Sequence, residues 1–129
     1  MGLDVSHDAF SGAYSAFNRF RKVLCEATGG HWCDEISGPE HWFVGEGYTR
    51  TSHPGLFAFF SSNDCEGSFD PDIALAIANE MEALLPKLDS IPQEIGGDIA
   101  RAGGYRKVAE RYIAGCRLAH ANDEPLEYM

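Results

Sequence analysis

The sequence lacks long apolar runs. No stretch approaches the roughly 20 apolar residues that a membrane-spanning helix requires. The opening residues MGLDVSHDAF have neither the basic start nor the apolar segment of a secretory signal. We therefore expect a soluble protein that stays in the cytoplasm. Four cysteines in 129 residues are too few for a small disulfide-built secreted scaffold, so free thiols are favoured over disulfides.

Basic residues are almost absent from the middle of the chain. The formal net charge is −10, and residues 26–98 hold fourteen aspartates and glutamates but only Arg50 and Lys87. The negative charge of this region repels the phosphates of nucleic acids, so direct binding of DNA or RNA is not expected. Cations and basic protein surfaces are attracted instead. The charge predicts a partner with a basic surface, and the plain alternative is an acidic face that only keeps the protein soluble.

Catalytic signatures are also missing. The glycine doublets are isolated and are typical of helix ends rather than of a phosphate-binding loop. No histidine or cysteine lies in the sequence context of a nucleophile elbow. His7, near Asp4 and Asp8, has the composition of a general-base pocket, but capping of the first helix is the favoured account. We therefore expect a protein without enzymatic activity.

Three segments of the chain have the apolar spacing of amphipathic helices. The first covers 10–24, with Ser6 or Asp8 as its cap. The second begins at Pro71 and continues to about residue 88, and the third covers 105–119. The length and composition fit one domain, so the whole chain 1–129 is predicted to fold as a unit.

Shorter elements complete the predicted fold. Residues 54–61 favour a short helix, although a buried strand also fits, and 98–102 favours another helical turn. A short strand is expected at 41–44. The two ends of the chain, GLDV and PLEYM, alternate apolar and polar residues and could pair as strands. The predicted class is α+β, mostly α: a compact bundle of three main helices with short terminal strands and an irregular aromatic-rich loop region.

Residues 62–73, SNDCEGSFDPDI, follow the spacing of a calcium-binding loop. Gly67 takes the sixth position, where a tight turn is needed, while Asp64, Glu66 and Asp70 take ligand positions. The first and twelfth positions hold serine and isoleucine, so the acids on which such loops depend are missing there. Weak binding of calcium or magnesium by these three carboxylates is therefore the alternative to a turn that caps the next helix.

A zinc site is less strongly indicated. Cys25, His31, Cys33 and His41 are suitable ligand types, but no Cys-x-x-Cys or His-x-x-x-His pair is present. The spacing of Cys25 also fits the buried side of the first helix.

Aromatic residues crowd the acidic stretch that follows the first helix. Large rings within a charged loop region are typical of protein-binding surfaces, although the same rings could instead cover the core. As the partner-binding set we predict Trp32, Asp34, Glu35, Glu40, Trp42, Phe43, Glu46 and Tyr48.

Three blocks of the sequence resemble a family of small bacteriophage and prophage proteins with no assigned activity. The blocks are GLDVSHDAFSGAYSAFNRFR, SNDCEGSFDPD and YIAGCRLAHANDEPLEY, about half of the chain. The family's middle motif has the form His-Ser-Asp-Cys-Asp-Gly, and here Ser62 and Glu66 replace its histidine and its second aspartate. The resemblance implies a phage setting inside a bacterial host cell.

We predict a non-catalytic binding module that inhibits or modulates a host defence protein, acting as a monomer or small homo-oligomer. A metal-dependent ligand-binding or enzymatic domain built on 62–73 is the alternative. Sequestration of a small signalling nucleotide is a further one, although the scarcity of basic residues makes it harder.

Overall fold

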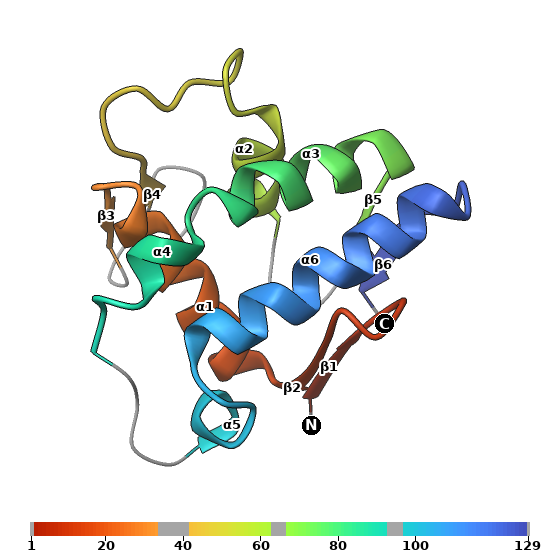
Figure 1. Cartoon of the computed structure of the whole chain (residues 1–129), viewed down its shortest axis with the longest axis horizontal. Coiled ribbons are helices and arrows are strands. Elements are labelled where there is room, and N and C mark those ends of the chain that lie inside the picture. Colours follow the sequence, from red (N-terminus) through yellow and green to blue (C-terminus); the bar gives the residue numbers. More distant parts are fainter. Residues whose placement is uncertain (1, 34–41, 63–66, 93–96, 129) are drawn as a thin grey trace.

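The computed structural model describes residues 2–33, 42–62, 67–92 and 97–128 (Figure 1). The helices are α1 (Tyr14–Ala27), α2 (Pro54–Ser61), α3 (Pro71–Glu82), α4 (Leu85–Leu88), α5 (Gly97–Arg101) and α6 (Tyr105–Ala121). The strands are β1 (Gly2–Val5), β2 (Phe10–Ala13), β3 (His31–Trp32), β4 (Trp42–Phe43), β5 (Gly67–Phe69) and β6 (Leu126–Tyr128). The α+β class is confirmed. No helix among the described residues is long and apolar enough to cross a membrane.

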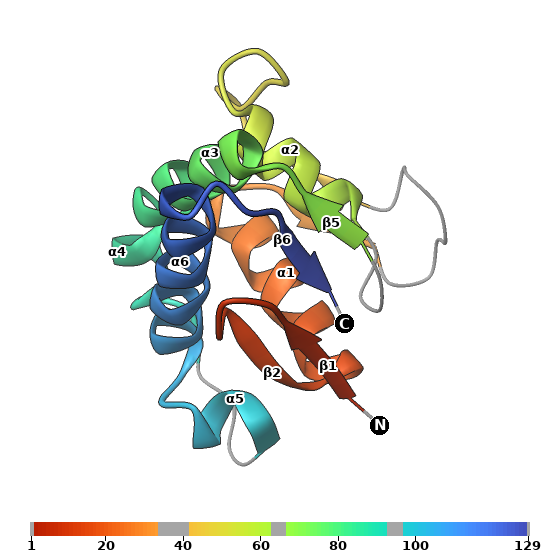
Figure 2. The same cartoon turned by 90° about the vertical axis from the view of Figure 1, so that its right-hand side faces the viewer.

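A four-stranded antiparallel sheet closes one side of the helices (Figure 2). Its strand order is β2-β1-β6-β5, so the strand nearest the end of the chain occupies an inner position. Val5 pairs with Tyr128, and Phe69 pairs with Leu126. The predicted pairing of the two chain ends is therefore confirmed. It is extended on both sides by strands that sequence analysis did not predict.

The core is rich in aromatic rings drawn from distant parts of the chain. Tyr112 of α6 is fully buried, and its ring centroid lies 5.2 Å from that of Phe59 and 6.1 Å from that of Phe17. Its hydroxyl is 2.9 Å from the hydroxyl of Tyr128. Burial raises the pKa of Tyr128 to about 12 and that of Tyr112 well above the usual tyrosine value, so both phenols stay neutral and can share this hydrogen bond.

The predicted start of the first helix is wrong. Residues 10–13 form β2, and α1 begins at Tyr14 with Ala13 as its N-cap, so Ser6 and Asp8 cap nothing. The apolar side chains of Phe10 and Ala13 fit helical spacing, whereas in a strand they lie on opposite faces, and pairing with β1 decides the outcome. The glycine doublet Gly29-Gly30 does follow a helix end, as expected of such doublets: α1 continues to Ala27, Thr28 is its C-cap, and Gly29 has a left-handed φ of 86°.

Most other helix predictions are confirmed. Helix α2 spans 54–61, and its N-terminal Gly55 and Leu56 N–H groups donate to the Glu80 carboxylate of α3 at 3.0 and 2.9 Å. Helix α3 begins at Pro71, but it ends at Glu82, and the apolar stripe continues into the separate turn α4. Helix α6 covers the predicted third segment and pairs closely with α3.

The turn between β1 and β2 packs against α6 at a glycine. A Cβ atom on Gly115 would lie 2.4 Å from the Cβ of Ala9 and 2.8 Å from its Cα. Only a residue without a side chain therefore allows the hairpin to approach the helix this closely.

We expect Gly115→Ala to destabilise the protein by about 1–3 kcal/mol, because the added methyl group collides with the backbone of the hairpin. At an unobstructed helix position the same change would stabilise by about 1 kcal/mol. Urea unfolding measures the sign of the change in the free energy of unfolding. The exposed neighbour Ala114, changed to glycine, gives the helix-propensity effect alone as a control. A gain in stability for Gly115→Ala would contradict the packing described above.

Candidate functional site

The two tryptophans of the predicted partner-binding set lie in the core. Trp32 and Trp42 are 5% and 8% exposed. The Trp42 ring packs at 5.3 Å from Phe57 and 5.5 Å from Phe60, and Arg21 lies 5.2 Å from the centroid of Trp32. Both indole rings therefore pack between the β3–β4 ribbon and the helices. This is the alternative in which the aromatic rings cover the core, and neither ring is available to a partner in this structure.

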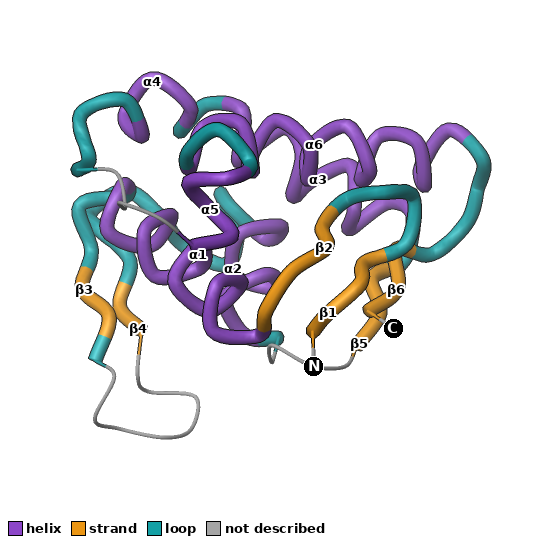
Figure 3. Tube along the Cα trace, turned by 90° about the horizontal axis from the view of Figure 1, so that it is seen from below, coloured by secondary structure: helices purple, strands orange, loops and turns teal. Residues whose placement is uncertain are grey.

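The other described members of the set remain accessible. Phe43 is 52% exposed and Glu46 is exposed, whereas Tyr48 is half-buried and stacks on His53 with a centroid separation of 4.4 Å. Figure 3 shows the ribbon carrying Phe43 at the end of the molecule away from the four-stranded sheet. The other predicted members lie outside the described residues: Asp34, Glu35 and Glu40.

The predicted metal ligands are only partly within the described chain. Asp70 is exposed at the N-cap position of α3 and makes no side-chain capping bond, and Gly67 belongs to strand β5. Asp64 and Glu66 lie outside the described residues. In the ranges that the structure covers, no group of three or more histidine, cysteine, aspartate or glutamate side chains is arranged to hold a metal ion. Calcium or magnesium binding by this loop stays a prediction.

The cysteines in the helices are buried and poorly suited to nucleophilic chemistry. Burial raises the pKa of Cys25 to about 11 and that of Cys116 to about 12, so both thiols stay protonated at neutral pH. Cys25 Sγ lies 3.5 Å from the carbonyl oxygen of Phe43 and 3.7 Å from that of His31, contacts that fix the ribbon to α1. The buried position of Cys25 agrees with the prediction that it lies on the buried side of the first helix, rather than with a role as a zinc ligand.

A polar cluster that the sequence only hinted at surrounds the β1–β2 turn. The Ala9 N–H donates to the Ser6 carbonyl, and the two residues between them, His7 and Asp8, have φ values of 59° and 58°. This is the backbone of a type I′ turn, which ordinarily favours Asn-Gly. Left-handed conformations at two residues with side chains cost free energy, so other contacts must offset that cost.

Side chains from the other end of the sequence supply those contacts. The His7 ring, only 13% exposed, lies 2.9 Å from Ser6 Oγ through Nδ1 and 3.0 Å from Glu124 Oε1 through Nε2. The hydrogen bond with His7 lowers the pKa of Glu124. Arg111 of α6 donates to the carbonyl oxygen of Asp8 at 2.8 Å and to its carboxylate at 2.6 Å. His7 and Asp8 therefore do not have the predicted role of capping the first helix. They form a strained turn that is held by contacts with Ser6, Arg111 and Glu124.

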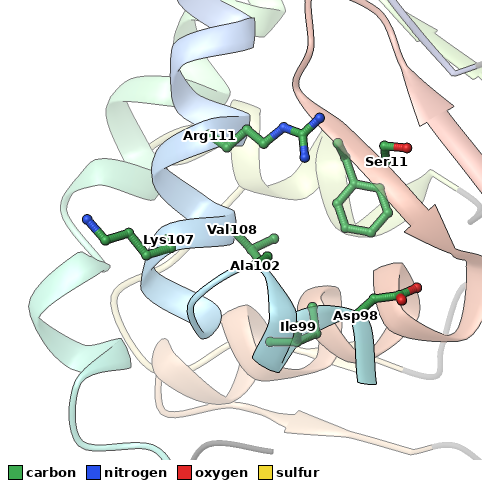
Figure 4. Close-up of a pocket in the computed structure, with 8 residues that line it drawn as sticks. Ser11, Asp98, Ile99, Ala102, Lys107, Val108 and Arg111 are labelled. Carbon is green, nitrogen blue, oxygen red and sulfur yellow. The ribbon is translucent and has the colours of Figure 1, made fainter. Parts of the chain in front are cut away.

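A cavity of about 140 Å³ opens beside this turn, between β2, α5 and α6 (Figure 4). Asp98 lies on one wall, where it accepts a hydrogen bond from the Ala13 N–H at 2.7 Å and pairs with Arg101. Gly12 permits this approach, since a Cβ atom there would lie 3.1 Å from Asp98 Oδ2. We call this the α5–α6 cavity; its lining residues are Phe10, Ser11, Asp98, Ile99, Ala102, Lys107, Val108 and Arg111.

Sequence reasoning missed this cavity because its residues come from three distant segments without a shared motif. The available signal was the alternation of apolar and polar residues from Leu3 to Ser6, which indicates a strand directly before His7 and Asp8. No protein-family model, curated protein or solved structure matches the chain.

The buried thiols give a direct check of this arrangement. In a Cys33→Ser, Cys65→Ser variant, we expect Cys25 and Cys116 to resist a thiol-specific reagent at about pH 8, because both thiols are enclosed and protonated. Both should react once denaturant is added. A single Cys65→Ser variant is the control, since it keeps the partly exposed Cys33 and should react while folded. Rapid reaction of the double variant in its folded state would contradict the burial.

Proposed function

We propose that this chain is a non-catalytic protein-binding module whose contact surface is the end of the β3–β4 ribbon. The observation that carries the proposal is the exposure of Phe43, 52%, on a ribbon whose two tryptophans are buried. Large aromatic side chains that stand out from a well-packed support are the anchors that contribute most to protein interfaces.

The backbone around Phe43 is held in place before any partner arrives. The Gly45 N–H donates to Thr28 Oγ1 at 3.0 Å, and a Cβ on Gly30 would lie only 2.0 Å from the Phe43 carbonyl oxygen. Together with the Cys25 contact, these close approaches fix the ribbon against the end of α1. A pre-organised anchor loses less conformational entropy on binding and therefore binds more tightly.

Charge indicates the kind of partner. The sequence that joins β3 to β4, residues 33–41, contains Asp34, Glu35 and Glu40 and no lysine or arginine, and Glu46 follows on the other side of Phe43. A basic protein surface with an apolar pocket complements this combination. With the phage resemblance, the partner we propose is a host protein of the bacterial cytoplasm, such as a defence factor that the module inhibits or modulates.

The proposal is tested by capture from a bacterial host lysate on the immobilised protein. At about 0.1 M salt we expect the wild-type chain to retain one basic protein, and we expect release at several times that salt concentration, where exposed charges are screened. Phe43→Ser and Glu46→Lys should each reduce the retention by at least tenfold. Titration calorimetry with the purified partner then gives the affinity of each variant.

Leu118→Ser is the matched control. Leu118 is 48% exposed on α6, so the control removes a comparable apolar surface from another element. It should leave binding unchanged. Equal retention by Phe43→Ser, or no retained protein at low salt, would refute the proposed surface.

A further inference from the structure

The α5–α6 cavity combines an apolar floor with a cation at its rim. Phe10, Ile99 and Val108 form the floor and are 4%, 1% and 4% exposed. Apolar cavities of about 150 Å³ are large enough for a benzene ring, and this one, at about 140 Å³, is of that size. Its volume and apolar floor therefore suit one aromatic ring or a branched aliphatic group of similar volume.

Arg111 has hydrogen-bonding capacity that the turn does not use. Its guanidinium carries five N–H groups. Nε donates one to the Asp8 carbonyl oxygen, and Nη2 donates one to the Asp8 carboxylate. Nη1 has no hydrogen-bond partner within residues 2–33, 42–62, 67–92 and 97–128. In Figure 4 the guanidinium extends toward Ser11 across the cavity, so these N–H groups lie at its rim.

Asp8 already pairs with Arg111, and the remaining charged residues near the cavity orient a ligand rather than compete for it. Lys107, one turn before Arg111 on α6, points away from the cavity and pairs with Glu110 at 3.6 Å. Asp98 on the opposite wall is a fixed negative charge held by the Ala13 N–H and Arg101. The Ser11 hydroxyl already donates to Asp4 at 2.7 Å. An anionic group is therefore favoured at Arg111 and disfavoured at the Asp98 end.

We propose that the α5–α6 cavity binds a small monocarboxylate, with the apolar group on the floor and the carboxylate on Arg111. A planar guanidinium suits a carboxylate because two N–H groups can donate to its two oxygens at once. A dianion would place a second negative charge near Asp98 and is excluded on that ground. This site shares no residue with the β3–β4 ribbon, so the proposed ligand can be tested independently of the protein-binding role.

The experiment uses benzoate as the probe, with the full-length protein followed by NMR. We expect saturable shifts of the backbone amides of Ser11, Ile99 and Val108, with a dissociation constant on the order of 1 mM or tighter for a ligand of this size. Benzamide, which has the same shape without the charge, should bind at least tenfold more weakly. Acetate, which lacks the ring, should produce no saturable shift at these amides.

Three variants separate the contributions of the cavity, of the Arg111 cation and of the turn contact to benzoate binding. Ala102→Phe fills the cavity from an exposed lining position and should abolish benzoate binding without loss of fold. Arg111→Met should weaken benzoate binding at least tenfold and leave benzamide unaffected. Asp8→Asn weakens the same turn contact while it keeps the guanidinium, so benzoate binding should persist; this control separates loss of the cation from loss of the turn.

Either of two results would overturn the proposal as a whole, and a third would overturn its placement of the carboxylate on Arg111. One is the absence of saturable shifts with benzoate up to tens of millimolar, well above the expected dissociation constant. The other is equal binding of benzoate to the wild-type protein and to Ala102→Phe, which would place the ligand elsewhere. Equal affinity for benzoate and benzamide would refute the role of Arg111.

Discussion

The hydrogen bond between the hydroxyls of Tyr112 and Tyr128 is the contact on which the rest of this structure depends. Both phenols are buried among phenylalanine rings, where an unpaired hydroxyl would cost about 1–3 kcal/mol. The bond joins α6 to β6, and β6 in turn joins β1 to β5. This polar contact inside a core rich in aromatic rings therefore helps to fix the position of α6 relative to the sheet.

The positive charges of α6 are largely used for internal contacts. Arg106 pairs with Asp89, Arg111 with Asp8 and Arg117 with Glu82, so the helix is linked to three other parts of the chain. Exposed pairs of this kind stabilise a fold only modestly, but they define how the elements meet. Two of these pairs use acids from the middle of the chain, Asp89 and Glu82. The proposed protein-binding surface and the proposed carboxylate site depend on opposite charges in different parts of the molecule.

The helices could be predicted from the sequence because their signals are local. Proline at the first turn and apolar residues at helical spacing located α2, the start of α3 and α6 without knowledge of the rest of the chain. Strand β2 was missed because its apolar residues continue the helical spacing of α1, and β5 was missed because its pairing depends on β6, which is far away in sequence. Trp32 and Trp42 seemed exposed only because their sequence neighbours are charged, whereas their rings turn toward Phe57 and Phe60. The α5–α6 cavity has no local signal, since no periodicity links Phe10, Asp98 and Arg111.

The inner position of β6 has a consequence for the order of folding. Pairing of Val5 with Tyr128 closes a loop that spans almost the whole chain, at an entropic cost of about 4 kcal/mol for its length. Contacts between α2 and α3 join segments that are close in sequence and carry a smaller cost of this kind. We therefore expect the pairing of β1 with β6, and with it the contact between Tyr112 and Tyr128, to form late in folding.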